Sequence, residues 1–459
     1  MKLLLISANR ERSPYPVFPI GLAYLVPSLA AAGHELRGID FCLNDDPLAE
    51  LQQSLAGFKP DAAIISIRNI DNVTWPGSRF YFDGVRQIVD ACRDRTVTIV
   101  GGSGFSIMPR ELLAALAADY GVVGEGEAVL PALLAAIAAG ETAPRIPGVL
   151  LRGRDDFLPP TPLSDIGTPD RTLFDVAAYH RQGGMANLQT KRGCPFTCTY
   201  CTYPLLEGAR IRTRPIADII REMRRLVDDL GVNYLYFVDD IFNFPTDFAM
   251  ELCRAMEREN LPVNWSAFIN PDFLPPRLLD AMLAAGCDAL EFGTDSGSPA
   301  VLAALRKSFD VETIRSASNL CRERNVDFAH YILFGGPGET AATVAESFAL
   351  MDELQPTAVI GMTGIRIFKG TALYRQAIAE GLISADDDLF QPRFYIAPAV
   401  RENLAELVTE AALARTNWVV PGLEINISDA MLAMLRQFPV RGPLWKLMKR
   451  LGRSRVRPI

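Results

Sequence analysis

The sequence KRGCPFTCTYC, residues 191–201, is the most informative stretch of this chain. It places Cys194, Cys198 and Cys201 in a C-x3-C-x2-C spacing, whereas the other five cysteines are scattered over 459 residues. Cysteine thiolates hold iron–sulfur clusters, and a cubane of four irons normally takes four of them. Three thiolates leave one iron open to a small molecule that offers an amine and a carboxylate. The competing interpretations are a zinc site, which needs a fourth Cys or His nearby, and chance clustering of buried thiols.

The composition is that of a globular chain with two or three domains. Apolar residues make up 49% of the chain and charged residues 22%, which excludes a disordered protein. The net charge is −8, the wrong sign for a protein whose main partner is nucleic acid. The first residues do not form a signal peptide, and no run reaches the ~18 apolar residues of a membrane span. We therefore expect a cytoplasmic protein with no nucleic-acid partner and no integral membrane association.

Residues 1–145 predict an α/β domain with a Rossmann-like parallel sheet. Apolar runs alternate with helical segments, and the predicted strands are KLLLIS (2–7), HELRGID (34–40), DAAIISI (61–67), VTIVGG (97–102) and YGVVGEGE (120–127). Strands that alternate with helices form open parallel sheets. Ligands bind at the carboxyl ends of such strands, where SIRNIDN (66–72), GGSGFS (101–106) and GEGE (124–127) lie.

Residues 146–185 are rich in Pro, Gly and Asp, which predicts a linker or strap. Alternation resumes over 186–395, with predicted strands ANLQTKRG (186–193), NYLYFV (233–238), VNWSAFI (263–269), DALEFGT (288–294), DFAHYILFG (327–335) and AVIGMTGIRIF (358–368). Six units predict a partial (β/α)6 TIM-type barrel, whose chemistry lies at the carboxyl ends of the strands. Residues 396–459 predict a small helical region. Its basic tail, residues 441–459, is either solvated or a docking or membrane-surface contact.

The cysteine motif, with the aromatic Tyr200 just before its third cysteine, resembles that of the radical S-adenosylmethionine superfamily. Four later segments resemble strands of that family's barrel: YFVDDIF (236–242), EFGTDSGSPAVLAAL (291–305), YILFGGPGET (331–340) and IRIFKGTALY (365–374). The resemblance implies a [4Fe-4S] cluster on the three cysteines and S-adenosylmethionine on Tyr200, Asp239, Asp240, Asp295 and Ser296. By themselves the two adjacent aspartates could begin a helix or bind a metal, and the Asp-Ser pair could cap a helix.

The front region resembles the cobalamin-binding domain of two-domain members of that superfamily. The matching segments are residues 13–41, 65–72, 101–116 and 122–134. The resemblance implies cobalamin contacts at Arg68, Gly101, Gly102, Ser103, Gly104, Gly124 and Glu125. The Asp-x-His-x-x-Gly pattern that supplies an axial histidine elsewhere is absent, so the cobalt would have no protein histidine. A front domain that holds no cobalamin and shapes the substrate pocket is the alternative.

Arg68 lies in SIRNIDN, which resembles the motif of tryptophan-methylating members, where an arginine lies below the corrin. A cation there disfavours an axial ligand on cobalt. The other interpretation is that Arg68 pairs with Asp71 or caps a strand. Among the histidines, His34 is expected to be structural and His330 faces either the core or a cavity. The remaining cysteines are expected to be buried thiols: Cys42, Cys92, Cys253, Cys287 and Cys321.

The implied chemistry is reductive cleavage of a carbon–sulfur bond of S-adenosylmethionine, driven by an electron from a donor such as flavodoxin or ferredoxin. We expect a cobalamin-dependent methyltransferase that acts on a small natural-product or lipid precursor. The alternative is a cobalamin-independent radical enzyme. It would rearrange a ring, form a bond, or transfer a 3-amino-3-carboxypropyl group to a soft nucleophile such as arsenite in arsenical antibiotic biosynthesis. A non-catalytic cluster or corrinoid sensor is a third class. No residue is singled out as catalytic.

Overall fold

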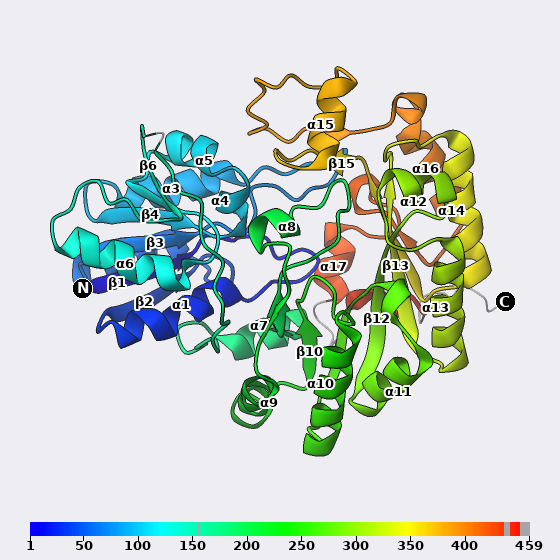
Figure 1. The fold of residues 1–459 in the computed structure, drawn as a ribbon, viewed down its shortest axis with the longest axis horizontal. Helices are drawn as coiled ribbons and strands as arrows, with labels where there is room; N and C mark the ends of the chain where they lie inside the picture. Colours follow the sequence, from blue (N-terminus) through cyan, green and yellow to red (C-terminus); the bar gives the residue numbers. More distant parts are fainter. Residues whose placement is uncertain (155, 436–440, 450–459) are drawn as a thin grey trace.

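Two sheets organise the chain, and the computed structural model describes residues 1–154, 156–435 and 441–449 (Figure 1). The first sheet has the strand order β2-β1-β3-β4-β5-β6. Its strands are β1 (Lys2–Ser7), β2 (Glu35–Asp40), β3 (Ala62–Ser66), β4 (Val97–Gly101), β5 (Tyr120–Val122) and β6 (Val149–Leu151). The first five strands are parallel, which confirms the Rossmann-like prediction, and β6 pairs antiparallel with β5. This edge strand comes from the segment that we expected to be a linker.

Helices cover both faces of the first sheet because its central strands are apolar on both faces. On β1, Leu3 and Leu5 pack against one layer, which contains α1 (Ile20–Ala31) and α6 (Gly126–Ala138). Leu4 and Ile6 face the other layer. Its helices are α2 (Pro47–Gly57), α3 (Phe82–Cys92) and α5 (Pro109–Leu116). A further short helix, α4 (Ser103–Ile107), follows the carboxyl end of β4.

The second sheet is a parallel partial barrel with the order β17-β14-β13-β12-β11-β10-β7. Its strands are β7 (Ala186–Leu188), β10 (Tyr234–Phe237), β11 (Asn264–Ile269), β12 (Cys287–Asp295), β13 (Asp327–Phe334), β14 (Ala358–Thr363) and β17 (Trp418–Val419). The six predicted units are confirmed. The seventh strand, β17, comes from the region that we expected to be helical, and it is too short to leave a pattern in the sequence.

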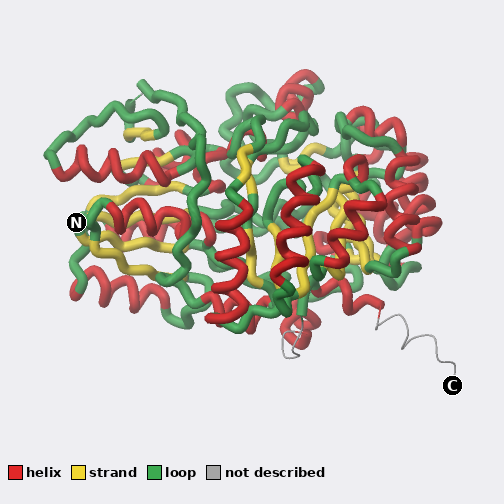
Figure 2. The backbone as a smooth tube through the Cα atoms, turned by 60° about the horizontal axis from the view of Figure 1, so that its bottom comes forward, coloured by secondary structure: helices red, strands yellow, loops and turns green. Residues whose placement is uncertain are grey.

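Helices lie on the outer side of the barrel sheet, as Figure 2 shows with helices in red and strands in yellow. The crossover helices are α9 (Ile216–Arg224), α10 (Thr246–Glu259), α11 (Pro276–Ala284), α13 (Val311–Glu323) and α14 (Ala341–Leu354). The remaining elements are α7 (Val176–Gly183), β8 (Lys191–Arg192), α8 (Tyr203–Leu206), β9 (Arg212–Thr213), α12 (Pro299–Ala304), β15 (Ile365–Arg366), α15 (Ala372–Ala379), β16 (Phe394–Tyr395), α16 (Leu404–Leu413) and α17 (Asp429–Leu435). In the described ranges, no helix has both the length and the apolar character needed to cross a membrane.

The basic tail is partly docked. Residues 441–449 contain a 3-10 turn at Leu444–Leu447, and Trp445 within it is only 8% exposed. The expectation of a solvated tail is therefore wrong for this part, because an apolar side chain inserts into the barrel. Residues 450–459, on which the rest of that expectation falls, lie outside the described residues.

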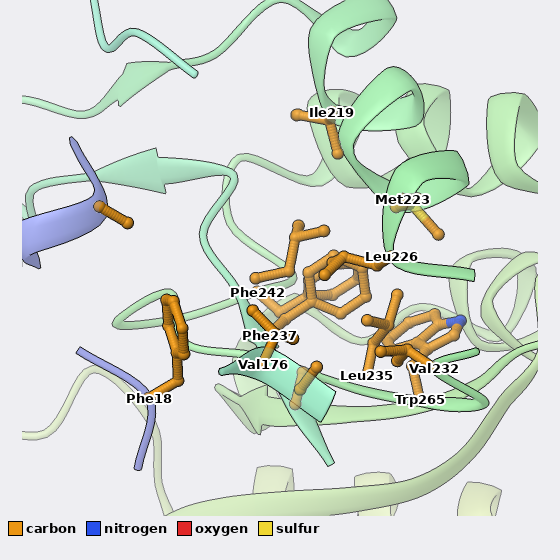
Figure 3. Packing of buried hydrophobic residues seen from close by; sticks show 14 of the residues in the cluster. Phe18, Val176, Ile219, Met223, Leu226, Val232, Leu235, Phe237, Phe242 and Trp265 are labelled. Atoms are coloured by element: carbon orange, nitrogen blue, oxygen red, sulfur yellow. The ribbon is translucent and has the colours of Figure 1, made fainter. Parts of the chain in front are cut away.

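One hydrophobic core runs through the boundary between the two domains (Figure 3). Phe18, in the loop before α1, packs edge-on against Tyr179 of α7 with ring centroids 5.5 Å apart. Both rings belong to the same buried cluster as Phe237, Phe242 and Trp265 of the barrel. Sliding one domain against the other would open cavities in this cluster, so the packing holds the domains in one arrangement.

A buried ion pair joins the same two domains. The Arg366 Nε of β15 donates to the Asp71 Oδ2 at 3.0 Å, and both side chains are at most 2% exposed. Asp71 also accepts a hydrogen bond from the Val73 amide, and Arg366 donates to the Leu389 carbonyl oxygen. Asp71 thus pairs with a cation of the barrel and also accepts from a backbone amide of its own loop.

We predict that Arg366→Met destabilises the protein strongly. Removing one member of a buried pair leaves an uncompensated charge, which typically costs about 3–5 kcal/mol of unfolding free energy. Thermal unfolding followed by circular dichroism checks this. The control is Arg315→Met, because Arg315 pairs with Glu353 at the surface and its loss is expected to change little. Equal melting temperatures for the two variants would contradict the prediction.

Candidate functional site

The three cysteines lie together at the carboxyl end of the first barrel strand, in the loop between β8 and α8. The Cys194 amide donates to the Gly208 carbonyl oxygen at 3.1 Å, and the Thr199 amide donates to the Leu305 carbonyl oxygen at 3.1 Å. These hydrogen bonds fasten the cysteine loop to the segment between α8 and β9 and to the end of α12. Cys194 is buried, while Cys198 and Cys201 are half-buried. The loop therefore presents its thiols to a sheltered region at the catalytic end of the barrel.

The thiols are close enough to influence one another electrostatically. Burial raises the pKa of Cys194 to about 11 and of Cys201 to about 12, and the neighbouring cysteines add to both shifts. Yet no group of three or more Cys, His, Asp or Glu side chains within the described ranges converges on a single metal ion. In a cubane each thiolate binds a different iron, so the thiols need not converge. The three thiols could each bind a different iron, and cluster assembly would then displace the thiol protons.

Asp240 is a half-buried acid with one buried carboxylate oxygen. No hydrogen-bond donor in the described part of the chain reaches its Oδ2 atom. Burial first, and then the carboxylates of Glu207 and Asp239, raise the pKa of Asp240 from its usual 3.8 to about 8. Asp240 also contributes to the raised pKa values of Cys194 and Cys201, which places it beside the cysteine loop. An unpaired acid there suits the amino group of S-adenosylmethionine.

Asp239 is engaged within the protein instead. Its Oδ1 accepts from the Thr190 amide at 2.6 Å, and its Oδ2 accepts from the Lys191 Nζ at 2.9 Å. The Lys191 and Asp239 side chains are at most 3% exposed. Asp239 therefore anchors the strand that leads into the cysteine loop, and Asp240 is the carboxylate of the pair that remains free for a ligand.

Tyr200, Asp295 and Lys307 form a second group beside the cysteines. The Tyr200 hydroxyl donates to Asp295 Oδ2 at 2.6 Å, and the Lys307 Nζ donates to the same oxygen at 2.7 Å. Burial lowers the pKa of Lys307, but Asp295 and then Cys198 outweigh this and hold it above its usual value. A buried cation thus lies next to the thiols. Sequence reasoning missed Lys307, since a single lysine after a helix carries no pattern.

Ser296 is oriented away from this group. Its hydroxyl shares a hydrogen bond with the Ser347 hydroxyl at 3.2 Å and accepts from the Ser298 amide at 3.1 Å. These contacts fix the turn between β12 and α12. The structure therefore brings Asp295 to Tyr200 of the cysteine loop, whereas Ser296 bonds to Ser298 and to Ser347 of α14.

The front domain has a cavity of ≈210 Å³ at the switch point of its sheet. Its lining includes Asn9 after β1 and Arg68 after β3, which are neighbouring strands with helices on opposite faces. Open α/β sheets bind ligands at such a point. Arg68 is exposed, and within the described part of the chain no ion pair or side-chain hydrogen bond holds its guanidinium. The expected alternative pair with Asp71 is wrong, because Asp71 binds Arg366.

The glycine run after β4 packs against the Arg68 loop. Gly102 has φ +97°, and a Cβ atom there would lie 2.7 Å from the Ile67 carbonyl oxygen. At Gly104 a Cβ atom would lie 2.9 Å from Asn69, and at Gly101 it would lie 3.2 Å from a carbonyl oxygen of β5. The Ser103 hydroxyl donates to the Arg68 carbonyl oxygen at 2.8 Å. The glycines thus allow the loop after β4 to contact the Arg68 loop closely.

Glu125 joins the two domains. Its carboxylate pairs with Arg192 of β8 at 2.8 Å and with Arg212 of β9 at 2.6 Å. Burial raises its pKa, but these arginines outweigh burial and lower it. The neighbouring Gly124 amide donates to the Ser106 hydroxyl at 2.9 Å. Glu125, which we expected to contact cobalamin, therefore contacts β8 and β9, the strands before and after the cysteine loop. Sequence reasoning missed this role.

The histidines and remaining cysteines are structural in this fold. His330 is buried, stacks on Phe292 at 5.2 Å and shares hydrogen bonds with Thr294 and Ser318, so it faces the core and not a cavity. His34 contacts the chain's amino terminus. The five other cysteines are buried free thiols, as expected.

Comparison with known proteins identifies the two domains. A profile of the radical SAM superfamily matches residues 188–351, and a profile of the B12 binding domain matches residues 6–134. A tryptophan 2-C-methyltransferase from Streptomyces laurentii is 26% identical over 424 residues, which cover 77% of this chain and 70% of that protein. An uncharacterised methyltransferase from Pyrococcus horikoshii is 25% identical over 396 residues, which cover 83% and 84%.

A solved structure has the same fold. The radical S-adenosylmethionine methyltransferase TsrM from Kitasatospora setae, with tryptophan and a S-adenosylmethionine analogue bound, superposes with a TM-score of 0.88. The match covers 99% of each chain at 23% sequence identity. The likeness therefore extends over the linker and the C-terminal region as well as both domains.

We predict that Asp240→Asn stabilises the ligand-free protein in a pH-dependent manner. Asp240 has a pKa of about 8 in the folded protein and ionises near its usual 3.8 in the unfolded chain. Between about pH 4 and pH 8 the carboxyl is therefore ionised mainly in the unfolded chain, and the free energy of unfolding falls as the pH rises. The melting temperature of the variant should equal that of the wild type near pH 4 and exceed it increasingly up to pH 8. Asp386→Asn, at an exposed position, is the control. A constant difference for Asp240→Asn would disprove the assignment.

Proposed function

Because the chain belongs to the radical SAM superfamily and carries a B12-binding domain in front of its barrel, we propose that it transfers a methyl group from S-adenosylmethionine, by way of cobalamin, to a small-molecule acceptor. One observation carries the proposal. The helix α8 begins two residues after Cys201 and contacts α4, which follows the glycine run of the front domain (Figure 1). The two cofactor loops are therefore adjacent.

Exposed apolar side chains on α8 support a flat, largely apolar ligand between these loops. Tyr203 is 48% exposed and Leu205 is 57% exposed, although both belong to a helix that lies between the domains. Large apolar side chains left uncovered at such a position mark a ligand surface. A corrin ring, which is broad and planar, would cover them, and Arg68 of the switch-point cavity would lie near its other side.

When bound, the cluster supplies an electron, S-adenosylmethionine supplies the methyl group, and cobalamin carries that group to the acceptor. The chain's own residues hold and orient these groups. Cys194, Cys198 and Cys201 hold the cluster, and Asp240 accepts a hydrogen bond from the amino group of S-adenosylmethionine. Asp295, held by Lys307 and Tyr200, faces the rest of that molecule.

Arg68 and Glu125 have separate roles in the proposal. The guanidinium of Arg68, which no ion pair or side-chain hydrogen bond holds within the described residues, would supply a positive charge beside cobalamin when that cofactor is bound. Gly101, Gly102, Ser103, Gly104 and Gly124 bring backbone close to the same ligand. Glu125 holds the front domain against β8 and β9, so its role in cobalamin binding is indirect.

The cluster needs an external one-electron donor, and we propose a flavodoxin or a ferredoxin. An oxygen-sensitive cluster and free thiols suit the reducing cytoplasm, where we propose that the enzyme acts. Methyl transfer is favoured over 3-amino-3-carboxypropyl transfer, because residues 6–134 match a B12-binding domain and several relatives, including the two described above, are methyltransferases.

We predict that anaerobic reconstitution with iron, sulfide and hydroxocobalamin yields about four irons and one cobalt per chain. With S-adenosylmethionine labelled as CD3 and a chemical reductant, mass spectrometry should find the label on the corrinoid recovered from the protein. Cys198→Ala should lose the iron and the label. Cys253→Ala, which removes a buried thiol far from the loop in sequence, is the control and should keep both.

Two results would contradict the proposal. Four irons without cobalt would make the front domain a pocket-forming domain, and 3-amino-3-carboxypropyl products in place of label on the corrinoid would assign the alternative chemistry. Full iron retention after replacement of all three cysteines would refute the cluster assignment itself.

A further inference from the structure

A segment of the barrel half reaches back to the front domain. Residues 384–393, which we call the strap, lie between α15 and β16 and have no part in the chemistry described above (Figure 1). Leu389 is 2% exposed and belongs to a core cluster of the barrel, whereas the next residue, Phe390, packs against a core cluster of the front domain. Leu389 has φ +57°, a left-handed conformation that leucine rarely adopts. Two consecutive side chains of the strap thus join the two domains.

Phe390 packs against a pair of aromatic rings of the front domain. Its ring centroid lies 5.2 Å from that of Phe80 and 4.6 Å from that of Phe82, and both contacts are edge-on. The Phe80 and Phe82 rings are stacked with their centroids 5.9 Å apart. Ring pairs of these geometries are more favourable than the burial of their area alone. Phe80 lines the switch-point cavity, so the strap contacts a wall residue of that cavity.

The loop that forms this wall is held by the barrel at further points. The cavity is lined by both ends of the Arg68 loop (residues 67–81): Ile67, Arg68 and Asn69 at its start, and Phe80 and Tyr81 at its end. Within the loop, Asp71 pairs with Arg366, and Arg366 also donates to the Leu389 carbonyl oxygen at 2.9 Å. The Thr363 hydroxyl of β14 donates to the Trp75 carbonyl oxygen. Barrel-side residues therefore hold the loop at Asp71, Trp75 and Phe80.

The cavity offers groups that a ligand can use. Asn69 has a buried Oδ1 atom that no donor in the described part of the chain reaches. Arg10 and Arg68 add two positive charges to the lining. An acceptor oxygen and two cations suit a ligand that carries both hydrogen-bond donors and negative charge. Cobalamin carries amide donors and a phosphodiester, so the cavity residues fit this cofactor.

We propose that the strap is a latch on the cobalamin cavity: the Phe390 ring holds Phe80 in the cavity wall and thereby slows release of the cofactor. The inference rests on the proposed function and concerns regulation of its cofactor site. Phe390 is a positioning residue, because it acts through Phe80. Loss of its ring leaves the loop attached to the barrel at Asp71 and Trp75 but not at Phe80. The wall then opens more often, and changes of this kind act mainly on the dissociation rate.

The strap is also fastened at the carboxyl end of the barrel. β16, which follows the strap, pairs antiparallel with β15, and the Ile367 amide donates to the Arg393 carbonyl oxygen at 2.8 Å. β15 follows β14 by one residue, so this attachment lies at the end of the barrel where the chemistry of such folds takes place. Retention of cobalamin in the front domain is thereby linked to the arrangement of the barrel.

The test measures release of hydroxocobalamin from the reconstituted protein during a chase with excess methylcobalamin, in the dark and without oxygen. Gel filtration and the absorbance of the bound corrinoid give the rate. Phe390→Leu keeps an apolar side chain without the ring and should release the cofactor about tenfold faster, the size expected for the loss of two ring pairs. Phe390→Tyr keeps the ring and should match the wild type. The iron content should be the same in all variants.

Phe157→Leu is the matched control. Phe157 is likewise a half-buried phenylalanine that packs against the same front-domain core, but it does not line the switch-point cavity. Its variant should release cobalamin at the wild-type rate. Phe80→Leu should speed release, and adding Phe390→Leu to it should have little further effect, because the two rings act as one unit.

A second measurement needs no variant and decides the matter if Phe390→Leu does not fold. Hydroxocobalamin should slow hydrogen exchange in wild-type peptides that cover the strap and residues 79–82, and leave the peptide around Phe157 unchanged. Four results would overturn the latch: a wild-type release rate in Phe390→Leu, equal acceleration in Phe157→Leu, additive effects of the Phe80 and Phe390 variants, or unchanged exchange in the strap.

Failure of the proposed function is a separate result. A corrinoid that binds but acquires no CD3 label would contradict methyl transfer alone, since the release rates and hydrogen exchange need no turnover. A wild-type protein that binds no corrinoid would contradict both the proposed function and the latch.

Discussion

The packed boundary between the two domains is the constraint on which the site depends. Phe18 and Tyr179 belong to a core that continues into the barrel, and the Asp71–Arg366 pair is buried across the same boundary. Moving the domains apart would expose apolar surface and leave a charge unpaired, and each change is unfavourable. The chain thereby keeps α8 against α4. Two cofactors that must exchange a group need such a fixed separation, which a flexible linker could not provide.

The charges of the site are arranged for ligands that the free protein lacks. Asp239 is fully compensated by Lys191 and by backbone donors, whereas its neighbour Asp240 has a buried oxygen with no donor in the described part of the chain. Leaving an acid uncompensated destabilises the ligand-free fold, and natural proteins accept this at functional sites. Lys307 has the opposite sign and lies near the thiols. A negatively charged cluster and a positively charged sulfonium would each find complementary charge there.

Sequence reasoning predicts features that adjacent residues encode. The three cysteines, the alternating strands and helices, and the paired aspartates are all local patterns, and the structure brings Tyr200 and Asp295 to the cysteine loop. It fails where partners lie far apart in the chain. Arg68 has Asp71 as its nearest acid in sequence, yet Asp71 binds Arg366, 295 residues away. Spacing also cannot distinguish Asp239 from Asp240, because only the folded environment decides which carboxylate is already bonded.

Residues 441–449 lie at the amino ends of the barrel strands and reach the middle of the barrel. In barrels of this type the amino ends of the strands usually serve stability and the carboxyl ends serve chemistry. Trp445 enters from the stable end, and its bond to Glu291 reaches the middle of the barrel. A change in the position of residues 441–449 would alter this hydrogen bond to the Glu291 carboxylate directly. Residues 441–449 therefore approach the middle of the barrel from the end opposite to the cysteine loop.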